Sequence, residues 1–156
     1  MNNAIIWVIV IPLLAGLLCV IWSRYASFIA IISNLLTLAA SIVIVAEVYQ
    51  SGSFNHALGS WQPGLGISLR ADALSSILLL MSMLVISAAT FYASAYFTDP
   101  VKRARFWPLW LMLVVALNAL LLSGDLFNLY VTLELLGLSA VALTALSDNR
   151  AALQAA

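Results

Sequence analysis

The chain has 156 residues, of which 65% are hydrophobic and 8% are charged, with six basic and six acidic side chains and no formal net charge. Because soluble domains average about 25% charged residues, this composition excludes a soluble globular enzyme, a nucleic-acid-binding protein and a disordered regulator. The single cysteine, Cys19, excludes an intramolecular disulfide and a cysteine-based metal site. The sequence therefore predicts an integral membrane protein embedded in the lipid bilayer.

Five apolar segments each approach the length of about 20 residues that a helix needs to cross a bilayer. We expect helices at residues 4–22, 26–49, 73–97, 106–122 and 126–146. The first segment lacks the basic residues that precede a signal peptide, so it is interpreted as a retained helix. Barrel strands would alternate polar and apolar residues, which these segments do not. The predicted fold class is an all-α bundle of five transmembrane helices, a single membrane domain over residues 1–156.

Residues 50–72 form the sizeable loop between the second and third expected helices. Gln62-Pro63-Gly64 predicts a tight turn, and the alternation of residues 67–70 is typical of a strand, so we expect a short hairpin there.

In membrane proteins generally, lysine and arginine are concentrated in the loops on the side that faces the cytoplasm. Arg70 lies in the loop of residues 50–72, on the same side of the membrane as the N-terminus. The loops and the C-terminal tail on the opposite side contain the remaining basic residues, Arg24, Lys102, Arg103, Arg105 and Arg150. The N-terminus is therefore predicted outside and the C-terminus inside.

Glu134 is the charged residue near the middle of the fifth expected helix. Inserting a carboxylate at that depth costs at least about 2.5–3.5 kcal/mol, and ionisable groups inside a membrane are commonly functional. A group that gains and loses a proton there could act as a proton relay. The alternative is a neutral carboxylic acid that holds two helices together by a hydrogen bond.

Other polar side chains allow a packing role and a transport role. Asp125 precedes the fifth helix, where a carboxylate caps free N–H groups, although an entry site for ions is the alternative. Interhelical hydrogen bonds are sufficient to explain Asn118 and Asn128. Polar stripes on the second and third helices favour packing, whereas a face shared by Glu134, Gly137 and Thr144 is predicted to be a hydrated path. The stripes comprise Asn34, Thr37 and Ser41 on one helix and Ser87, Thr90 and Ser94 on the other.

The run Ser123-Gly124-Asp125-Leu126-Phe127-Asn128-Leu129-Tyr130-Val131-Thr132-Leu133-Glu134 resembles a motif of the antiporter-like proton-channel subunits, GD-(L/I)-FNL-(Y/F)-V-x-x-E. These subunits occur in respiratory complex I, membrane-bound hydrogenases and Mrp-type Na⁺/H⁺ antiporters. Residues 59–75 are similar to the family's loop segment, GGW-x-x-P-x-GI-x-L-x-x-D-x-LS, in which Asp72 matches the loop aspartate. The residues around both motifs are most similar to the D-type member of the Mrp antiporters.

The resemblance implies that Glu134 matches the family's fifth-helix glutamate, which pairs with a lysine on the seventh helix during proton transfer. It also implies an outward N-terminus and partners among other membrane subunits in the cell membrane of a prokaryote. The lysine and the broken helices of the family lie beyond the fifth helix, so we expect a split or truncated copy that needs a partner chain. The expected function is proton translocation or exchange of Na⁺ or K⁺ for H⁺.

Two other functions remain open at this point. The chain could be a subunit of a redox-driven pump, of the NADH:quinone oxidoreductase or hydrogenase type, or it could be a scaffold of helices that transports nothing. The sequence contains no pattern typical of a catalytic nucleophile, a phosphate-binding loop or a metal-ligand cluster. We therefore expect no cofactor, no metal and no catalytic site within this chain, and no nucleic acid among its partners.

Overall fold

The computed structural model describes residues 3–57, 67–97 and 99–146. Five helices in this part are long and apolar enough to cross a membrane, which confirms the predicted all-α membrane bundle. They are α1 (Ala4–Ile21), α2 (Ala26–Ser51), α3 (Ala73–Tyr96), α4 (Pro100–Leu121) and α5 (Leu126–Ala145), with a short 3₁₀ helix, η1 (Ser23–Tyr25), between the first two. The tail beyond residue 146 lies outside the described residues.

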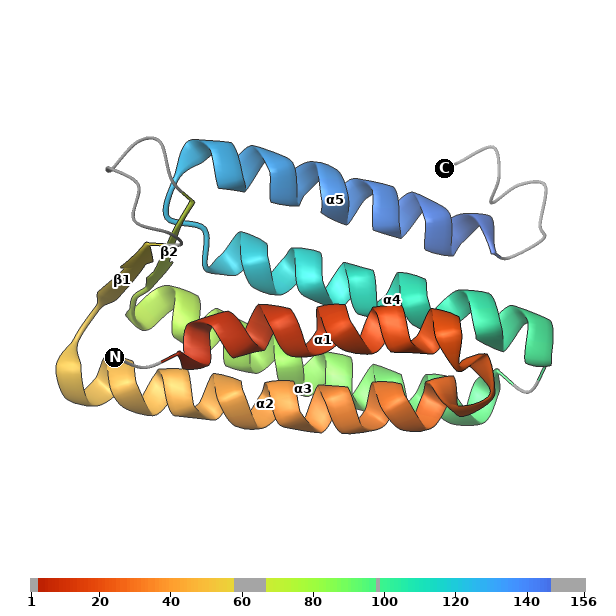
Figure 1. The fold of residues 1–156 in the computed structure, drawn as a ribbon. Helices are drawn as coiled ribbons and strands as arrows, with labels where there is room; N and C mark the ends of the chain where they lie inside the picture. Colours follow the sequence, from red (N-terminus) through yellow and green to blue (C-terminus); the bar gives the residue numbers. More distant parts are fainter. Residues whose placement is uncertain (1–2, 58–66, 98, 147–156) are drawn as a thin grey trace.

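The helices lie roughly parallel along one long axis, with α5 along one side of the bundle (Figure 1). α1 packs against α2 and α4, α2 packs against α3, and α5 packs against α4. Small side chains permit close approach between membrane helices. At the end near η1, the core accordingly combines Ala15, Ala26 and Ala30 with Trp107 and Leu111, all of them buried.

α4 begins at Pro100, earlier than the expected residue 106. Asp99 precedes it in an extended conformation, and its side chain accepts a hydrogen bond from Val101 N at 2.9 Å. Proline is favoured in the first turn because its missing N–H would have no helical partner there. The hydropathy pattern locates only the apolar part of this helix, and consequently Lys102, Arg103 and Arg105 belong to its first turns and not to a loop.

A hairpin joins α2 to α3 at the opposite end of the bundle. β1 (Phe54–Ala57) pairs antiparallel with β2 (Ser68–Ala71), with Phe54 opposite Ala71 and Ala57 opposite Ser68. The side chain of Leu69 is 2% exposed and belongs to a core cluster with residues of α1, α2 and α3. The expected turn at Gln62-Pro63-Gly64 lies outside the described residues.

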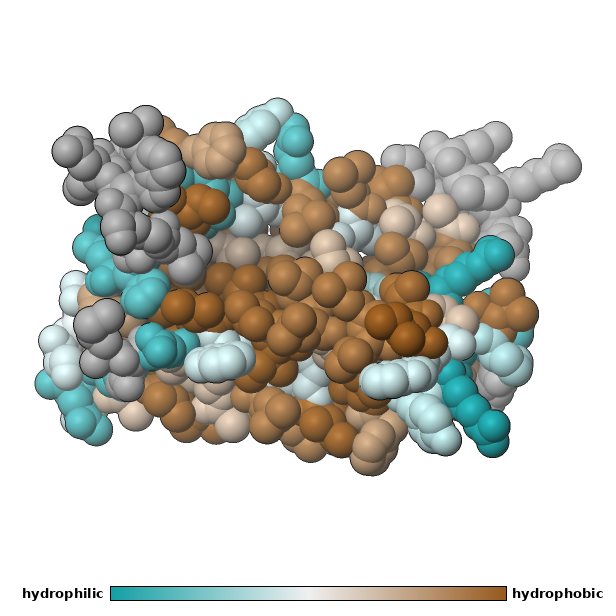
Figure 2. Space-filling view, in the orientation of Figure 1, coloured by the Kyte–Doolittle hydropathy of each residue, from teal (hydrophilic) through white to brown (hydrophobic). Residues whose placement is uncertain are grey.

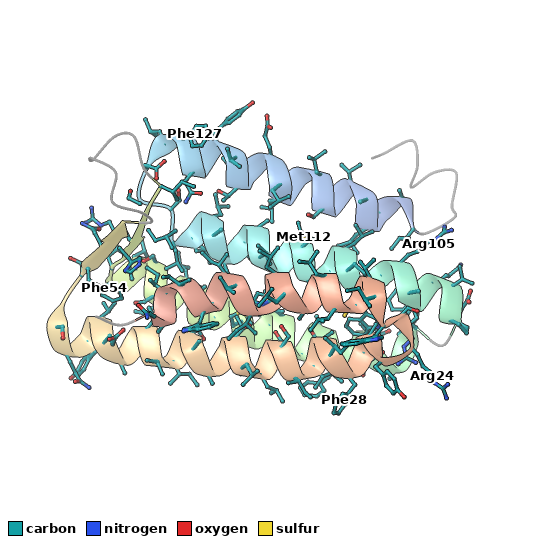
Figure 3. All side chains as sticks on the ribbon, viewed as in Figure 1. Arg24, Phe28, Phe54, Arg105, Met112 and Phe127 are labelled. Atoms are coloured by element: carbon teal, nitrogen blue, oxygen red, sulfur yellow. The ribbon has the colours of Figure 1, made fainter. Side chains whose placement is uncertain are left out.

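The surface is apolar around the middle of the bundle and polar at its ends. Figure 2 shows a brown band between teal patches at the two ends. Large apolar side chains such as Leu17, Val85 and Leu138 are more than half exposed, which suits contact with lipid. Arg24 and Arg105 lie at the end opposite the hairpin (Figure 3). The basic residues on the described helices thus share one end, and the orientation of that end toward the cytoplasm stays a prediction.

Candidate functional site

Glu134 lies in the middle of α5, and its side chain is exposed. The buried polar side chains of α5 are Asn128, Thr132 and Ser139, and α5 packs against α4. Since each residue turns a helix by about 100°, Glu134 lies nearly opposite Thr132. The carboxyl group therefore lies midway along a helix that is long and apolar enough to cross a membrane, and the described residues do not enclose it, a placement that hydropathy alone did not indicate.

Tyr130 is the hydrogen-bond partner of Glu134. Its hydroxyl donates to Glu134 Oε1 from one turn earlier on α5, on the same exposed face. Residues four apart on a helix are neighbours, so this contact could have been anticipated from the spacing in the motif. Gly137 and Thr144 are also exposed. The face that we expect to hold a hydrated path therefore points away from α4.

Asp125 joins the start of α5 to the hairpin. Its Oδ1 accepts from Asn128 N at 2.7 Å, which caps the helix, and its Oδ2 accepts from Ser68 N at 2.8 Å and from Ser68 Oγ at 3.4 Å. These hydrogen bonds, first that from Asn128 N and then that from Ser68 N, hold the pKa of the Asp125 carboxyl below its usual range. The Asp125 carboxylate therefore makes structural contacts with two residues: it caps α5 at Asn128 and links α5 to β2 at Ser68.

The backbone beside Asp125 continues the same junction. Gly124 N donates to Ser68 O at 2.8 Å, and Arg70 N donates to Leu122 O at 2.8 Å, so the α4–α5 connection pairs with β2. A Cβ on Gly124 would lie 2.9 Å from both Ser68 O and Ser68 Oγ. The residue at this position must therefore lack a side chain because two backbones approach closely.

Asp72 caps α3 at the other side of the hairpin. Its Oδ1 accepts from Ser75 N, and Ser75 Oγ accepts from Asp72 N, both at 2.9 Å. The Ser75 backbone N–H makes the largest contribution to a lowered pKa of the Asp72 carboxyl, and Arg70, with its Nε 3.8 Å from Asp72 Oδ2, also lowers it. The loop aspartate of the second motif is thus a helix cap.

The remaining candidate residues lie between helices and apart from the exposed face of α5. Asn34 Nδ2 donates to Ser87 Oγ at 2.9 Å and links α2 to α3, while Trp110 Nε1 of α4 donates to Thr90 Oγ1 of α3 at 3.0 Å. Asn118 Nδ2 of α4 donates to Val8 O of α1 at 3.1 Å. Within the described residues, these contacts do not link Ser87, Thr90 or Asn118 to Glu134.

Asn128 differs from Asp125 and Glu134, whose side chains form hydrogen bonds. Its backbone N–H donates to the Asp125 side chain, and its backbone carbonyl oxygen accepts a hydrogen bond from Thr132 Oγ1 at 2.8 Å. Its side-chain Nδ2 is buried and has no hydrogen-bond partner among the described residues.

The sequence did not indicate Ser68, which is the partner of both Gly124 and Asp125, because a contact across the molecule leaves no local pattern.

Comparison with known proteins gives relatives that are components of cation/proton antiporters and of NADH-quinone oxidoreductases. No family model matches the chain. The D component of the Na⁺/H⁺ antiporter of Alkalihalophilus pseudofirmus is 29% identical, with 96% of this chain and 31% of the relative covered. The N component of the NADH-quinone oxidoreductase of Desulforudis audaxviator is 34% identical, with 74% of this chain and 24% of the relative covered. The chain therefore spans about a third or less of the length of these relatives.

Solved structures agree with these relatives. A chain of the Mrp complex from Dietzia sp. is 28% identical and superposes with a TM-score of 0.80, over 92% of this chain and 28% of that one. A chain of an archaeal membrane-bound sulfane sulfur reductase has the same fold, with a TM-score of 0.83 and 23% identity, over 99% of this chain and 32% of that one. Sequence and fold together place this chain with the antiporter-like membrane subunits of the Mrp and complex I type, over about a third of their length.

Proposed function

We propose that this chain contributes a proton relay, Glu134, to a membrane complex that translocates protons or exchanges a monovalent cation for protons. The observation that carries the proposal is a carboxyl group in the middle of α5, held by Tyr130 on a face that α4 does not cover. A carboxyl group there must be either neutral or paired with a charge, because an isolated carboxylate in lipid is costly. Reversible protonation is the chemistry that such a group offers.

The whole site extends beyond these five helices. The relatives are about three times as long as the matched region, and the exposed face of α5 would be covered by helices from outside this region. A basic side chain from such a helix would pair with Glu134 and set its protonation. We therefore propose as partners the other membrane subunits of one complex and a chain segment that supplies the later helices, in the cell membrane of a prokaryote.

The test uses the intact complex in sealed vesicles, with cation flux driven by an imposed pH gradient. Glu134→Gln keeps the size of the side chain and removes the proton-binding carboxylate, so flux of Na⁺ or K⁺ is expected to fall to the level of protein-free vesicles. Glu47→Gln is the matched control, because it makes the same substitution near the end of α2. Cation flux in this variant is expected to equal that of the unmodified complex. Unchanged flux with Glu134→Gln would refute the relay.

A second function, part of a redox-driven proton pump, is favoured by the relative named as a component of NADH-quinone oxidoreductase. Purification of the native complex distinguishes the two, since a redox-driven pump would contain iron–sulfur subunits. A third function, a scaffold without transport, is distinguished by the flux experiment with Glu134→Gln. Glu134→Gln would then lower the yield of assembled complex and leave the flux per assembled complex unchanged.

A further inference from the structure

A cleft lies at the basic end of the bundle, between the turn that joins α1 to α2 and the start of α4. It has a volume of about 320 Å³ and is lined by Ser23, Arg24, Pro100 and Arg103. The two guanidinium groups come from separate elements, η1 and the first turns of α4. The fold therefore brings two permanent positive charges and one hydroxyl group to a single concave surface.

The charges of this cleft favour an anion. Arg103 Nε is buried and, in the part of the chain that the structure describes, has no hydrogen-bond partner. A buried guanidinium N–H without an acceptor is costly, and an anionic acceptor would remove that cost. The first turn of α4 adds the positive end of a helix dipole. The nearby carboxylate of Asp99 accepts from Val101 N and lines a different cleft, with Phe97 and Phe106.

The surroundings of Arg24 indicate the depth of the cleft in the bilayer. Trp22 and Tyr25, on either side of Arg24 in sequence, are 58% and 60% exposed. Exposed Trp and Tyr side chains are typical of the level of lipid headgroups. Ile21 and Phe28, on the adjoining turns of α1 and α2, are also exposed and offer an apolar surface to acyl chains. Figure 3 shows Arg24 and Phe28 at the same end of the bundle.

We propose that this cleft binds the phosphodiester group of an anionic phospholipid. Arg24 and Arg103 donate to the phosphate oxygens, the Ser23 hydroxyl adds a third donor, and the acyl chains lie against Ile21 and Phe28. Arginine suits this role because its planar fork of N–H groups matches phosphate geometry, which the ammonium group of lysine does not. Basic pockets between membrane helices on the cytoplasmic side bind acidic lipid headgroups in the same manner.

Native mass spectrometry of the intact complex, titrated with dioleoylphosphatidylglycerol or dioleoylphosphatidylcholine, tests the proposal. Arg24→Gln and Arg103→Gln are each expected to weaken phosphatidylglycerol binding by about tenfold, which corresponds to about 1.4 kcal/mol, and to leave phosphatidylcholine binding unchanged. Arg70→Gln is the matched control. It removes the same charge from the hairpin end, beside Asp72, and is expected to leave phosphatidylglycerol binding unchanged.

Three results would overturn the proposal. One is equal phosphatidylglycerol affinity in the unmodified complex and in a variant that carries both glutamine substitutions. Another is an equal loss with Arg70→Gln, which would indicate attraction by net charge alone. The third is displacement of the lipid by millimolar inorganic phosphate, which would assign the cleft to a soluble anion. If a glutamine variant unfolds, Arg24→Lys with Arg103→Lys keeps both charges, and its affinity is expected between those of the unmodified and the glutamine forms.

Discussion

The junction between the hairpin and the α4–α5 connection yields a prediction about Gly124. In Gly124→Ala the new Cβ would lie 2.9 Å from Ser68 O and Oγ and 3.2 Å from the carbonyl carbon of Ser68. Backbone atoms of β2 cannot rotate away as a flexible side chain can, so the two segments must separate. That movement lengthens the hydrogen bonds from Gly124 N to Ser68 O and from Arg70 N to Leu122 O, both 2.8 Å.

The expected cost follows from these contacts. Overpacking of a close contact costs about 1–3 kcal/mol, and weakening the two hydrogen bonds without breaking them adds about 1 kcal/mol in total, so the free energy of unfolding should fall by about 2–4 kcal/mol. The matched control is Gly137→Ala on α5, where a Cβ meets no atom within 4 Å. Alanine is favoured over glycine inside a helix by about 1 kcal/mol, so the control should be as stable as the unmodified protein or more stable.

The assay is the unfolding temperature of the purified protein in detergent, followed by tryptophan fluorescence. For a chain of this size, about 1 kcal/mol corresponds to roughly 2–4 °C, so the two alanine variants should differ by several degrees. Assembly of the complex, measured as the yield of co-purified subunits, should also fall with Gly124→Ala. An unfolding temperature for Gly124→Ala equal to that for Gly137→Ala would refute the reasoning, because the close approach to Ser68 would then carry no cost.

Further predictions concern polar contacts away from Glu134. Because hydrogen bonds from Asn128 N and Ser68 N lower the pKa of Asp125 in the folded protein, their stabilisation is complete above the usual carboxyl pKa and is lost as the pH falls through the lowered value. Asp125→Asn should therefore lower the unfolding temperature at neutral pH and flatten its decline in acid; an unchanged pH profile would contradict this. Ser87→Ala leaves the buried Asn34 Nδ2 without its acceptor and should cost about 1–3 kcal/mol. The unfolding temperature measures that loss, and a second substitution, Asn34→Leu, should recover part of it.

Tyr130 offers a separate test of how Glu134 is held. Tyr130→Phe removes the donor hydroxyl and keeps the ring, so the carboxyl group loses a hydrogen bond without losing its place on α5. If Glu134 is the relay, this variant should retain cation flux and change its dependence on pH. The flux assay at several pH values measures this effect, and a profile identical to that of the unmodified complex would show that the hydrogen bond has no part in transport.

Much of the architecture could be predicted from sequence because a bilayer imposes a simple length requirement. Uncharged segments of about 20 residues must become helices, since backbone groups in lipid need partners within the same segment. The fourth helix is the exception, because its start depends on the cap formed by Asp99 and Pro100 and not on hydropathy. The polar residues Asn34 and Ser87 were expected to serve packing, and they bond to each other between α2 and α3.

The sequence by itself determined the membrane class, the number of apolar helices, the hairpin and the glutamate within the motif, because each of these is written in a continuous stretch of residues. Only the tertiary structure decided where those residues point. It joined Asp125 and Gly124 to Ser68 across the α4–α5 connection, turned Glu134 away from α4, and brought Arg24 to Arg103 at the basic end. The physical reason is that such contacts depend on how separate helices pack, and packing joins residues whose distance along the chain gives no local signal.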